Sequence, residues 1–321
     1  MINGELIDLV AGDYEARIAT SGATLVHLRR AGSDLVIPFD AEVSLPEGWQ
    51  GKTLVPWPNR IVGARYAYRG QEYPVPCNEP ETGSALHGLV GWADFQVVAT
   101  SAGDDAVGDA PSSVALELTL PGSYAYPWSL QVDVRFALDA GAGLTVAATT
   151  TCLGAGAPAA PDAVGAPESD GLLAPAPYGV SFHPYLTRSV PLDECVLQVP
   201  AARVLDVDER MAPAAERDVA GTDWDWRAGR PVGTISTDNA YTGLPQGPWE
   251  VRLTGGEAGR TVVMSAEAPW VQVYTAEHLG RRGVAVEPMT CPPDAFNSGR
   301  DLVELEVGRS HSFSYSLRED D

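Results

Sequence analysis

The sequence predicts an all-β protein, built as a sandwich or a barrel from many short strands. Three observations predict this fold class. Apolar residues repeat with a period of two in many segments, as in strands with one buried face. Glycine and proline, with 33 and 26 residues among 321, separate these segments throughout the chain. No long amphipathic helix pattern interrupts them, which favours a sandwich or barrel.

The clearest strand is residues 130–138, where leucine, valine and phenylalanine at even positions alternate with polar residues or alanine. The glycine-rich turn that follows predicts a hairpin into 144–146. The same alternation occurs at 114–120 and at 311–317, where serines occupy the opposite face. The other predicted strands are 23–28, 65–69, 72–75, 249–253, 261–266 and 270–275.

Residues 154–177 differ from the rest, because they are rich in alanine, proline and glycine and show no period. Such a segment buries too little apolar surface to offset the entropy lost on ordering. Strand-like sequence continues on both sides. We therefore expect one domain over residues 1–321 that carries a flexible insertion at 154–177, either a plain surface loop or a lid.

The charge balance excludes several classes of partner. Lysine and arginine total 21 and aspartate and glutamate 43, which gives a net charge of −22. A surface this acidic repels nucleic acid and anionic membranes. No apolar run is long enough to span a membrane, and the N-terminus lacks the basic region of a secretory signal. Four cysteines without paired spacing favour free thiols, so we expect a cytoplasmic protein. The sequence leaves its oligomeric state open between monomer and homodimer.

Three segments break the strand pattern and place titratable groups beside glycine or proline. They are 56–61 with 86–89, then 177–185, then 286–297. Rigid, irregular backbone at strand ends is where binding and catalytic groups concentrate. Proline follows both His183 and Glu287 and favours extended backbone at each, which suits a side chain aimed into a cleft.

Most residues of these types are structural when taken singly. We expect structural roles for His27, His278 and His311, and we expect Trp92 to lie in the core. Trp57 is equally suited to the core and to stacking on a ligand. The functional signal lies in the combination of segments.

That combination resembles the aldose 1-epimerase (galactose mutarotase) family. The resemblance extends over residues 20–317 in the family's order, and the stretches that carry it are PNRIVGARYAYRGQEY, NEPETGSALHGLVGW, PYGVSFHPYL, WVQVYT and AVEPMTCPPDAFN. It implies a large antiparallel β-sandwich with a carbohydrate cleft on one face. Leu54-Val-Pro-Trp-Pro58 replaces the Gly-Arg pair of the best-known galactose mutarotases, and the sequence around Glu287 also differs, as in a bacterial side branch.

The resemblance also implies roles for individual residues. It implies catalytic roles for Glu287, His183 and His87, and substrate binding by Asn59, Arg60, Asp238 and Gln272. The implied reaction interconverts the α and β anomers of a free hexose such as glucose or galactose through ring opening. It needs one base and one acid, and neither a cofactor nor a metal. Reference pKa values of about 4.3 for glutamate and about 6.5 for histidine suit Glu287 as the base and His183 as the acid.

Three alternatives remain. His87, His183 and Glu287 form a two-histidine, one-carboxylate set, as in non-haem iron sites, although no local His-x-Asp/Glu pair accompanies it. A hexose-phosphate 1-epimerase would need a cationic phosphate clamp, and basic residues near the motifs are few. A non-catalytic sugar-binding module on the same fold would be expected to have lost the acid or the base.

Overall fold

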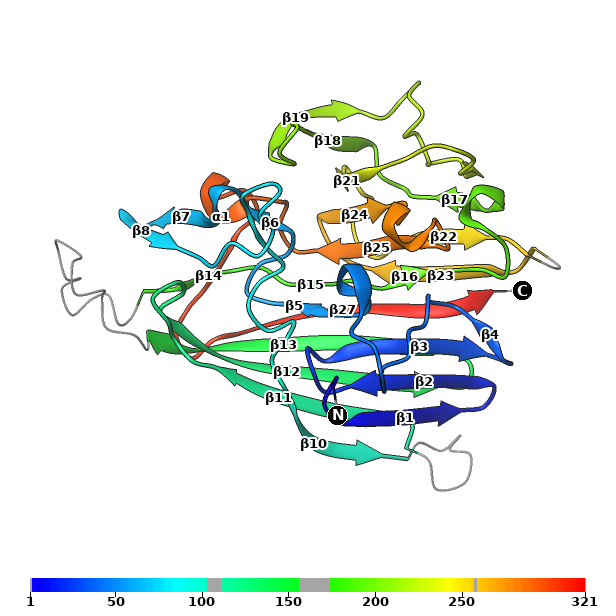
Figure 1. Ribbon diagram of the computed structural model, residues 1–321, viewed down its shortest axis with the longest axis horizontal. Coiled ribbons are helices and arrows are strands. Elements are labelled where there is room, and N and C mark those ends of the chain that lie inside the picture. The colour runs from blue at the N-terminus through cyan, green and yellow to red at the C-terminus, as the bar shows by residue number, and fades with distance from the viewer. Residues whose placement is uncertain (1, 103–110, 156–173, 257–258, 321) are drawn as a thin grey trace.

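A nine-stranded antiparallel sheet forms one layer of the molecule (Figure 1). The computed structural model describes residues 2–102, 111–155, 174–256 and 259–320. In spatial order the strands of this sheet are β10 (Gln96–Ser101), β11 (Ser113–Leu120), β12 (Trp128–Asp139), β13 (Gly143–Ala155), β27 (Ser310–Asp320), β23 (Thr261–Ala266), β22 (Trp249–Thr254), β17 (Val196–Gln198) and β20 (Arg230–Pro231).

Two further sheets form the opposite layer. The four-stranded sheet runs β1 (Leu6–Ala11), β2 (Tyr14–Ala19), β3 (Thr24–Arg30) and β4 (Ser33–Asp34). The eight-stranded sheet runs β19 (Pro213–Asp218), β18 (Arg203–Val207), β21 (Asp238–Thr242), β24 (Trp270–Tyr274), β25 (Val284–Met289), β15 (Ser181–Phe182) and β5 (Thr53–Leu54), with β16 (Tyr185–Leu186) also paired to β25. Backbone hydrogen bonds from Ile37 and Thr187 join the two sheets at β16.

Smaller pairings and short helical turns complete the fold. The pairings are β6 (Arg60–Ile61) with β9 (Ala85–Leu86), β7 (Arg65–Tyr68) with β8 (Gln71–Pro74), and β14 (Ala176–Tyr178) with β26 (Val303–Leu305). The 3-10 turns are η1 (Glu47–Trp49), η2 (Val62–Ala64), η4 (Leu192–Glu194) and η6 (Glu277–Leu279). The only α-helix in the described part of the chain is α1 (Ala295–Ser298).

The main core lies between the layers, where Phe182 of β15 packs on Phe313 and Tyr315 of β27 at ring-centroid distances of 6.0 and 4.9 Å. Both faces of β25 are buried, but they face different surroundings. Val284 and Val286 belong to the main core, whereas Ala285 belongs to a separate cluster. The strand therefore directs its odd-numbered side chains, Glu287 among them, to the outer face of the eight-stranded sheet.

The all-β prediction is confirmed, and each predicted strand overlaps an observed one. The predicted hairpin is present, with Asp139 paired to Gly143. Most of the 154–177 insertion, residues 156–173, lies outside the described residues. At its ends Ala155 closes β13 and Ala176 opens β14, so strand extends further into this segment than its composition predicts.

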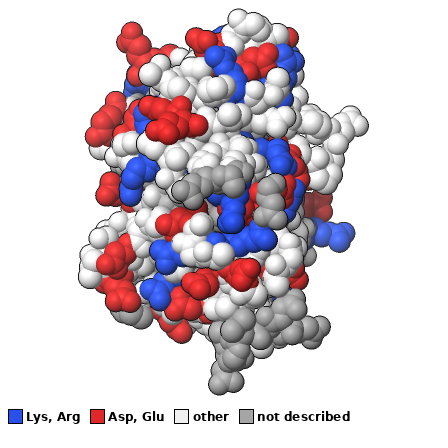
Figure 2. All heavy atoms as spheres, turned by 90° about the vertical axis from the view of Figure 1, so that its right-hand side faces the viewer, with Lys and Arg blue, Asp and Glu red and all other residues white. Residues whose placement is uncertain are grey.

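The four cysteines are free thiols, and Cys77 is the exposed one. No helix among the described residues is both long and apolar enough to cross a membrane. On the face shown in Figure 2, acidic and basic side chains are interspersed. Ion pairs among the described residues include Arg252 with Asp320 and Arg318 with Glu250.

Candidate active site

Three neighbouring strand positions align His183, Glu287 and Gln272 across the eight-stranded sheet. Ser181 pairs with Met289 and Tyr185 with Ala285, so His183, at the break between β15 and β16, lies opposite Glu287. On its other side Glu287 pairs directly with Gln272 of β24. The Gln272 amide donates to Asp238 Oδ1 on β21 at 2.7 Å. The sheet register alone therefore assembles much of the polar cluster.

A separate segment supplies His87 and the Asn59-Arg60 pair. Arg60 pairs with Leu86 across β6 and β9, which places His87 beside Asn59. The His87 backbone N–H donates to the Asn59 carbonyl at 2.8 Å, and the Asn59 N–H donates to His87 Nδ1 at 3.2 Å. Because Nδ1 accepts this bond, a neutral His87 carries its proton on Nε2 and is a hydrogen-bond donor.

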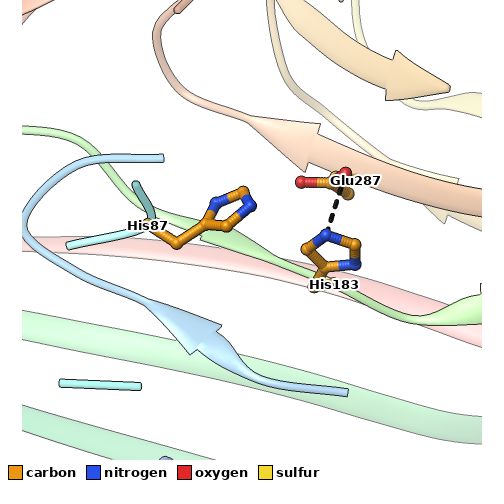
Figure 3. Close-up of side chains that lie close together, drawn as sticks. All are labelled: His87, His183 and Glu287. Carbon is orange, nitrogen blue, oxygen red and sulfur yellow. Dashed lines mark ion pairs between the residues drawn. The ribbon is translucent and has the colours of Figure 1, made fainter. Parts of the chain in front are cut away.

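These two groups of residues meet in a cavity of about 210 Å³. It is lined by Gly48, Trp49, Asn59, Arg60, Glu79, Leu86, His87, His183, Tyr185, Asp238, Tyr274, His278 and Glu287. A small cavity lined by several polar side chains suits a small polar ligand such as a monosaccharide. Figure 3 shows His87, His183 and Glu287 gathered at one place, with the contact between His183 and Glu287 dashed.

His183 and Glu287 form a buried pair at the floor of this cavity. His183 Nε2 lies 3.3 Å from Glu287 Oε1, and both residues are almost completely buried. Burial raises the pKa of Glu287 well above its usual range; the Asp238 carboxyl raises it further, and Arg60 opposes this. Burial lowers the pKa of His183 to about 3. Both shifts favour neutral forms, so the pair holds one exchangeable proton, and the ionised Glu287 expected from its reference pKa is not the favoured state.

Arg60 is held by a carboxylate that the sequence analysis does not single out. Its Nε and Nη2 atoms each donate to Glu79 at 2.7 Å, a two-point contact that fixes the guanidinium plane. The Thr82 hydroxyl also donates to Glu79. Burial acts to lower the pKa of Arg60, but Glu79, Asp238 and Glu287 raise it above its usual value. A charged Arg60 therefore lies beside Asp238 and Glu287.

Several atoms of the cluster have unused hydrogen-bonding capacity. Among the described residues, the buried side-chain atoms without a partner include His183 Nδ1, Gln272 Oε1 and Glu287 Oε2. Buried polar atoms are normally paired, so three such atoms in one cluster indicate a polar ligand. Strained backbone points the same way, because Trp49, Asn59 and His87 have φ values of 62°, 52° and 62°.

The cluster does not fit a metal ion well, although ligand atoms of His87, His183 and Glu287 lie within 4.8 Å of one another. A neutral imidazole has a single ring lone pair, and a metal ligand must use it. In His87 that lone pair accepts the Asn59 N–H, and the other ring nitrogen carries the proton. His183 and Glu287 alone fall short of the two-histidine, one-carboxylate set.

All but one of the candidate site residues line the cavity; Gln272 lies behind Asp238 and beside Glu287. Trp57 is buried and donates to the Ala85 carbonyl, so it belongs to the core. The expectation that Trp92 lies in the core is wrong, because Trp92 is 47% exposed and lies at the surface above Lys52. His278 lies in the cavity wall, and its structural role stays a prediction.

Sequence reasoning also misses Trp49, Glu79, Tyr185 and Tyr274 as cavity residues. Glu79 and Tyr185 stand inside the stretches NEPET and HPY, close to His87 and His183, so their position in these motifs could have indicated them. Trp49 lies in a segment with no motif. Only the fold brings η1 over the cavity.

Comparison with known proteins identifies the family. The aldose 1-epimerase family model matches residues 5–159 and 167–318. The chain is 38% identical over 316 residues to the Escherichia coli (strain K12) protein YihR, whose name describes it as uncharacterized; the match covers 98% of this chain and 93% of that protein.

Solved structures share the fold at low sequence identity. The GalM/aldose epimerase homologue of C. elegans has a TM-score of 0.79 at 20% identity, with 98% of each chain covered. The galactose 1-epimerase of Lactobacillus acidophilus has a TM-score of 0.78 at 16% identity, covering 96% of this chain and 92% of that one. With most of its length matched by the family model and its fold shared with these proteins, the chain belongs to the aldose 1-epimerase family.

Proposed function

We propose that this protein is a mutarotase that interconverts the α and β anomers of a free hexose, such as glucose or galactose, by acid–base ring opening and closure. The observation that carries the proposal is the buried His183–Glu287 pair, with 3.3 Å between Nε2 and Oε1, at the floor of a monosaccharide-sized cavity. A hemiacetal carbon bears two oxygens, and the reaction moves one proton at each. Two adjacent proton-transferring groups match that requirement.

The steps of ring opening and closure follow from the positions of the two transferred protons. With its proton on His183, the pair presents a carboxylate and an imidazolium. Glu287 then takes the proton of the C1 hydroxyl while His183 donates to the ring oxygen, and the bond between C1 and that oxygen breaks as the carbonyl forms. Rotation about the C1–C2 bond presents the other face of the aldehyde. Ring closure returns both protons, so Glu287 and His183 end as they began.

The surrounding side chains hold the sugar. His87, with Nε2–H as a donor, would bind the ring oxygen or a neighbouring hydroxyl. Arg60, Asn59 and Asp238 line the cavity and would bind the other hydroxyls. Gln272 lies outside the lining and donates to Asp238, so it would hold that carboxyl in place for the sugar. A small cavity with several convergent polar groups suits a polyhydroxylated ring.

The two alternative activities have less support. Among the described residues that line the cavity, Arg60 is the only lysine or arginine, and its guanidinium is already bound at two points by Glu79. The neighbouring Asp238 and Glu287 are acids and supply no positive charge to bind a phosphate. A non-catalytic module would have no need for a buried acid–base pair, whose desolvation is costly.

The test is polarimetry, or NMR of the anomeric protons, on freshly dissolved α-anomers of a panel of hexoses and their 6-phosphates. We expect fast equilibration of at least one free hexose and a weaker effect on the phosphates. Exhaustive dialysis against a chelator should leave the rate unchanged. No acceleration with any free sugar would overturn the proposal, and restoration of a lost rate by Fe(II), Mn(II) or Zn(II) would revive the metal alternative.

A further inference from the structure

Two tryptophans continue the active-site cluster outward to the molecular surface. The Trp49 ring meets His87 edge-on at 5.1 Å between centroids, and the Trp92 ring lies 5.5 Å from the Trp49 ring. Exposure falls along this series, from 47% at Trp92, through a half-buried Trp49, to 4% at His87 and 2% at Glu287. The rings therefore lead from solvent to the buried acid–base pair.

Trp92 is supported on one side by a buried cation. Lys52 Nζ lies 4.2 Å from the indole centroid, and Lys52 itself is fully buried. The ammonium also donates to the Ser21 carbonyl at 3.0 Å. Since Lys52 lies beneath the ring and nearly half of Trp92 remains exposed, the indole covers the ammonium with one face and presents the rest to solvent.

The Trp49 indole is also tightly packed against its neighbours. A Cβ added to Gly91 would lie 2.7 Å from Trp49 Cζ3, so the indole packs directly on the glycine backbone next to Trp92. The Trp49 backbone has a φ of 62°, an unfavourable conformation for a bulky residue. A strained, tightly packed aromatic beside an exposed one indicates rings held ready for a ligand, because ordering them on binding then costs little.

We propose that Trp92, together with the outer side of Trp49, forms a subsite for the second ring of a reducing disaccharide, a role that rests on the proposed function. The reacting C1 must reach His183 and Glu287 at the buried end of the cavity. The far side of the same ring then faces outward, and a sugar linked there extends toward Trp92. The apolar C–H face of that second sugar would stack on the exposed indole.

The test compares glucose with maltose, a 4-linked disaccharide with a free anomeric centre, in wild type and Trp92→Ala. We expect the substitution to lower kcat/KM about tenfold more for maltose than for glucose, which corresponds to about 1.4 kcal/mol. Trp92→Phe should recover most of the difference, since it retains an aromatic face. Tyr124→Ala, which removes another exposed aromatic residue, is the matched control and should change neither substrate.

Calorimetric titration with methyl maltoside and methyl glucoside separates the subsite from the proposed function, because neither glycoside can mutarotate. Tighter binding of the maltoside, lost in Trp92→Ala, would support the subsite even if no sugar were epimerised. Equal losses for both sugars, or no loss for maltose, would overturn it. A change in sedimentation of Trp92→Ala from dimer to monomer would also overturn it, since a second copy of the chain would then cover the ring.

Discussion

The two large sheets differ in the length and regularity of their strands. In the nine-stranded sheet, β12 has 12 residues whose burial alternates along the strand, and the neighbouring β13 has 13 residues. In the eight-stranded sheet, β5, β15 and β16 have two residues each, and all six residues of β25 are buried. The candidate active site lies wholly on this second, irregular sheet and the segments that cover it.

The irregularity has a direct consequence for chemistry. The sheet register places His183 opposite Glu287. The strand breaks there, between β15 and β16, and the backbone of His183 bonds instead to Lys52 and Gly51 through hydrogen bonds of 3.0 and 2.9 Å. These bonds hold the imidazole beside the carboxylate. The regular sheet supplies rigidity, and the interrupted sheet supplies the polar groups.

The first prediction tests whether the interrupted sheet supplies the catalytic groups. Glu287→Gln preserves shape but removes the group that takes a proton. Turnover should fall at least about 10³-fold, because the carboxylate acts in the transition state, whereas sugar affinity should stay within about tenfold. An anomerisation assay and a calorimetric titration on one preparation measure both. Equal losses in rate and affinity would indicate that Glu287 only positions the sugar.

The second prediction tests whether the regular nine-stranded sheet supplies stability without taking part in catalysis. Leu130 of β12 is fully buried in the main core. Leu130→Ala should lower the free energy of unfolding by about 2–5 kcal/mol, as is usual for such truncations, with kcat and KM of the folded protein unchanged. Denaturant unfolding and the anomerisation assay measure the two effects. A large fall in kcat at a temperature where the variant is fully folded would contradict the division between the sheets.

The same division explains how much the sequence predicts. Residues 130–138 reveal their strand because one face is more buried than the other, and a period of two follows. Val284–Met289 has no such period because both faces are covered, one by the core and one by the site. The long strands and the all-β class were therefore predictable from alternation, while β25 and β21 were not.

For the candidate site, titratable residues beside glycine and proline indicated the correct segments. The resemblance to a family assigned roles to individual residues, and these roles stay predictions. Glu79 and Trp49 were missed for different reasons. The importance of Glu79 depends on a contact with Arg60 across 19 positions. The position of Trp49 depends on how η1 folds over another part of the chain. Neither is a property of local sequence.

The third prediction concerns Glu79 as a positioning residue for Arg60. Glu79→Gln removes the charge and one of the two acceptors that orient the guanidinium. We expect KM to rise about tenfold with kcat within about threefold, because Arg60 contacts sugar and not the transferred protons. Asp8→Asn, which weakens the similar two-point pair with the surface residue Arg17, is the matched control and should leave KM unchanged. A fall in kcat at constant KM would contradict this role.

The last prediction concerns stability, and its effect has the opposite sign to that of a typical core substitution. Burial raises the pKa of Glu287 well above its usual range, so the folded protein binds this proton more tightly than the unfolded chain does. Above the unfolded pKa of about 4.3, the unfolded chain releases the proton first. The folded state then loses stability by up to about 1.4 kcal/mol per pH unit until the pH passes the pKa of Glu287 in the folded protein.

The Glu287→Gln variant has no such proton. The difference in free energy of unfolding between this variant and wild type should therefore move in favour of the variant as pH rises from about 4 to 7. Denaturant unfolding across that range, with Glu117→Gln on the exposed side of β11 as the control, measures it. If the difference in free energy of unfolding does not change with pH, contacts with Arg60 offset the burial of the Glu287 carboxyl. If the difference rises with pH, the buried carboxyl lowers the stability of the folded protein, a cost that the regular sheet does not bear.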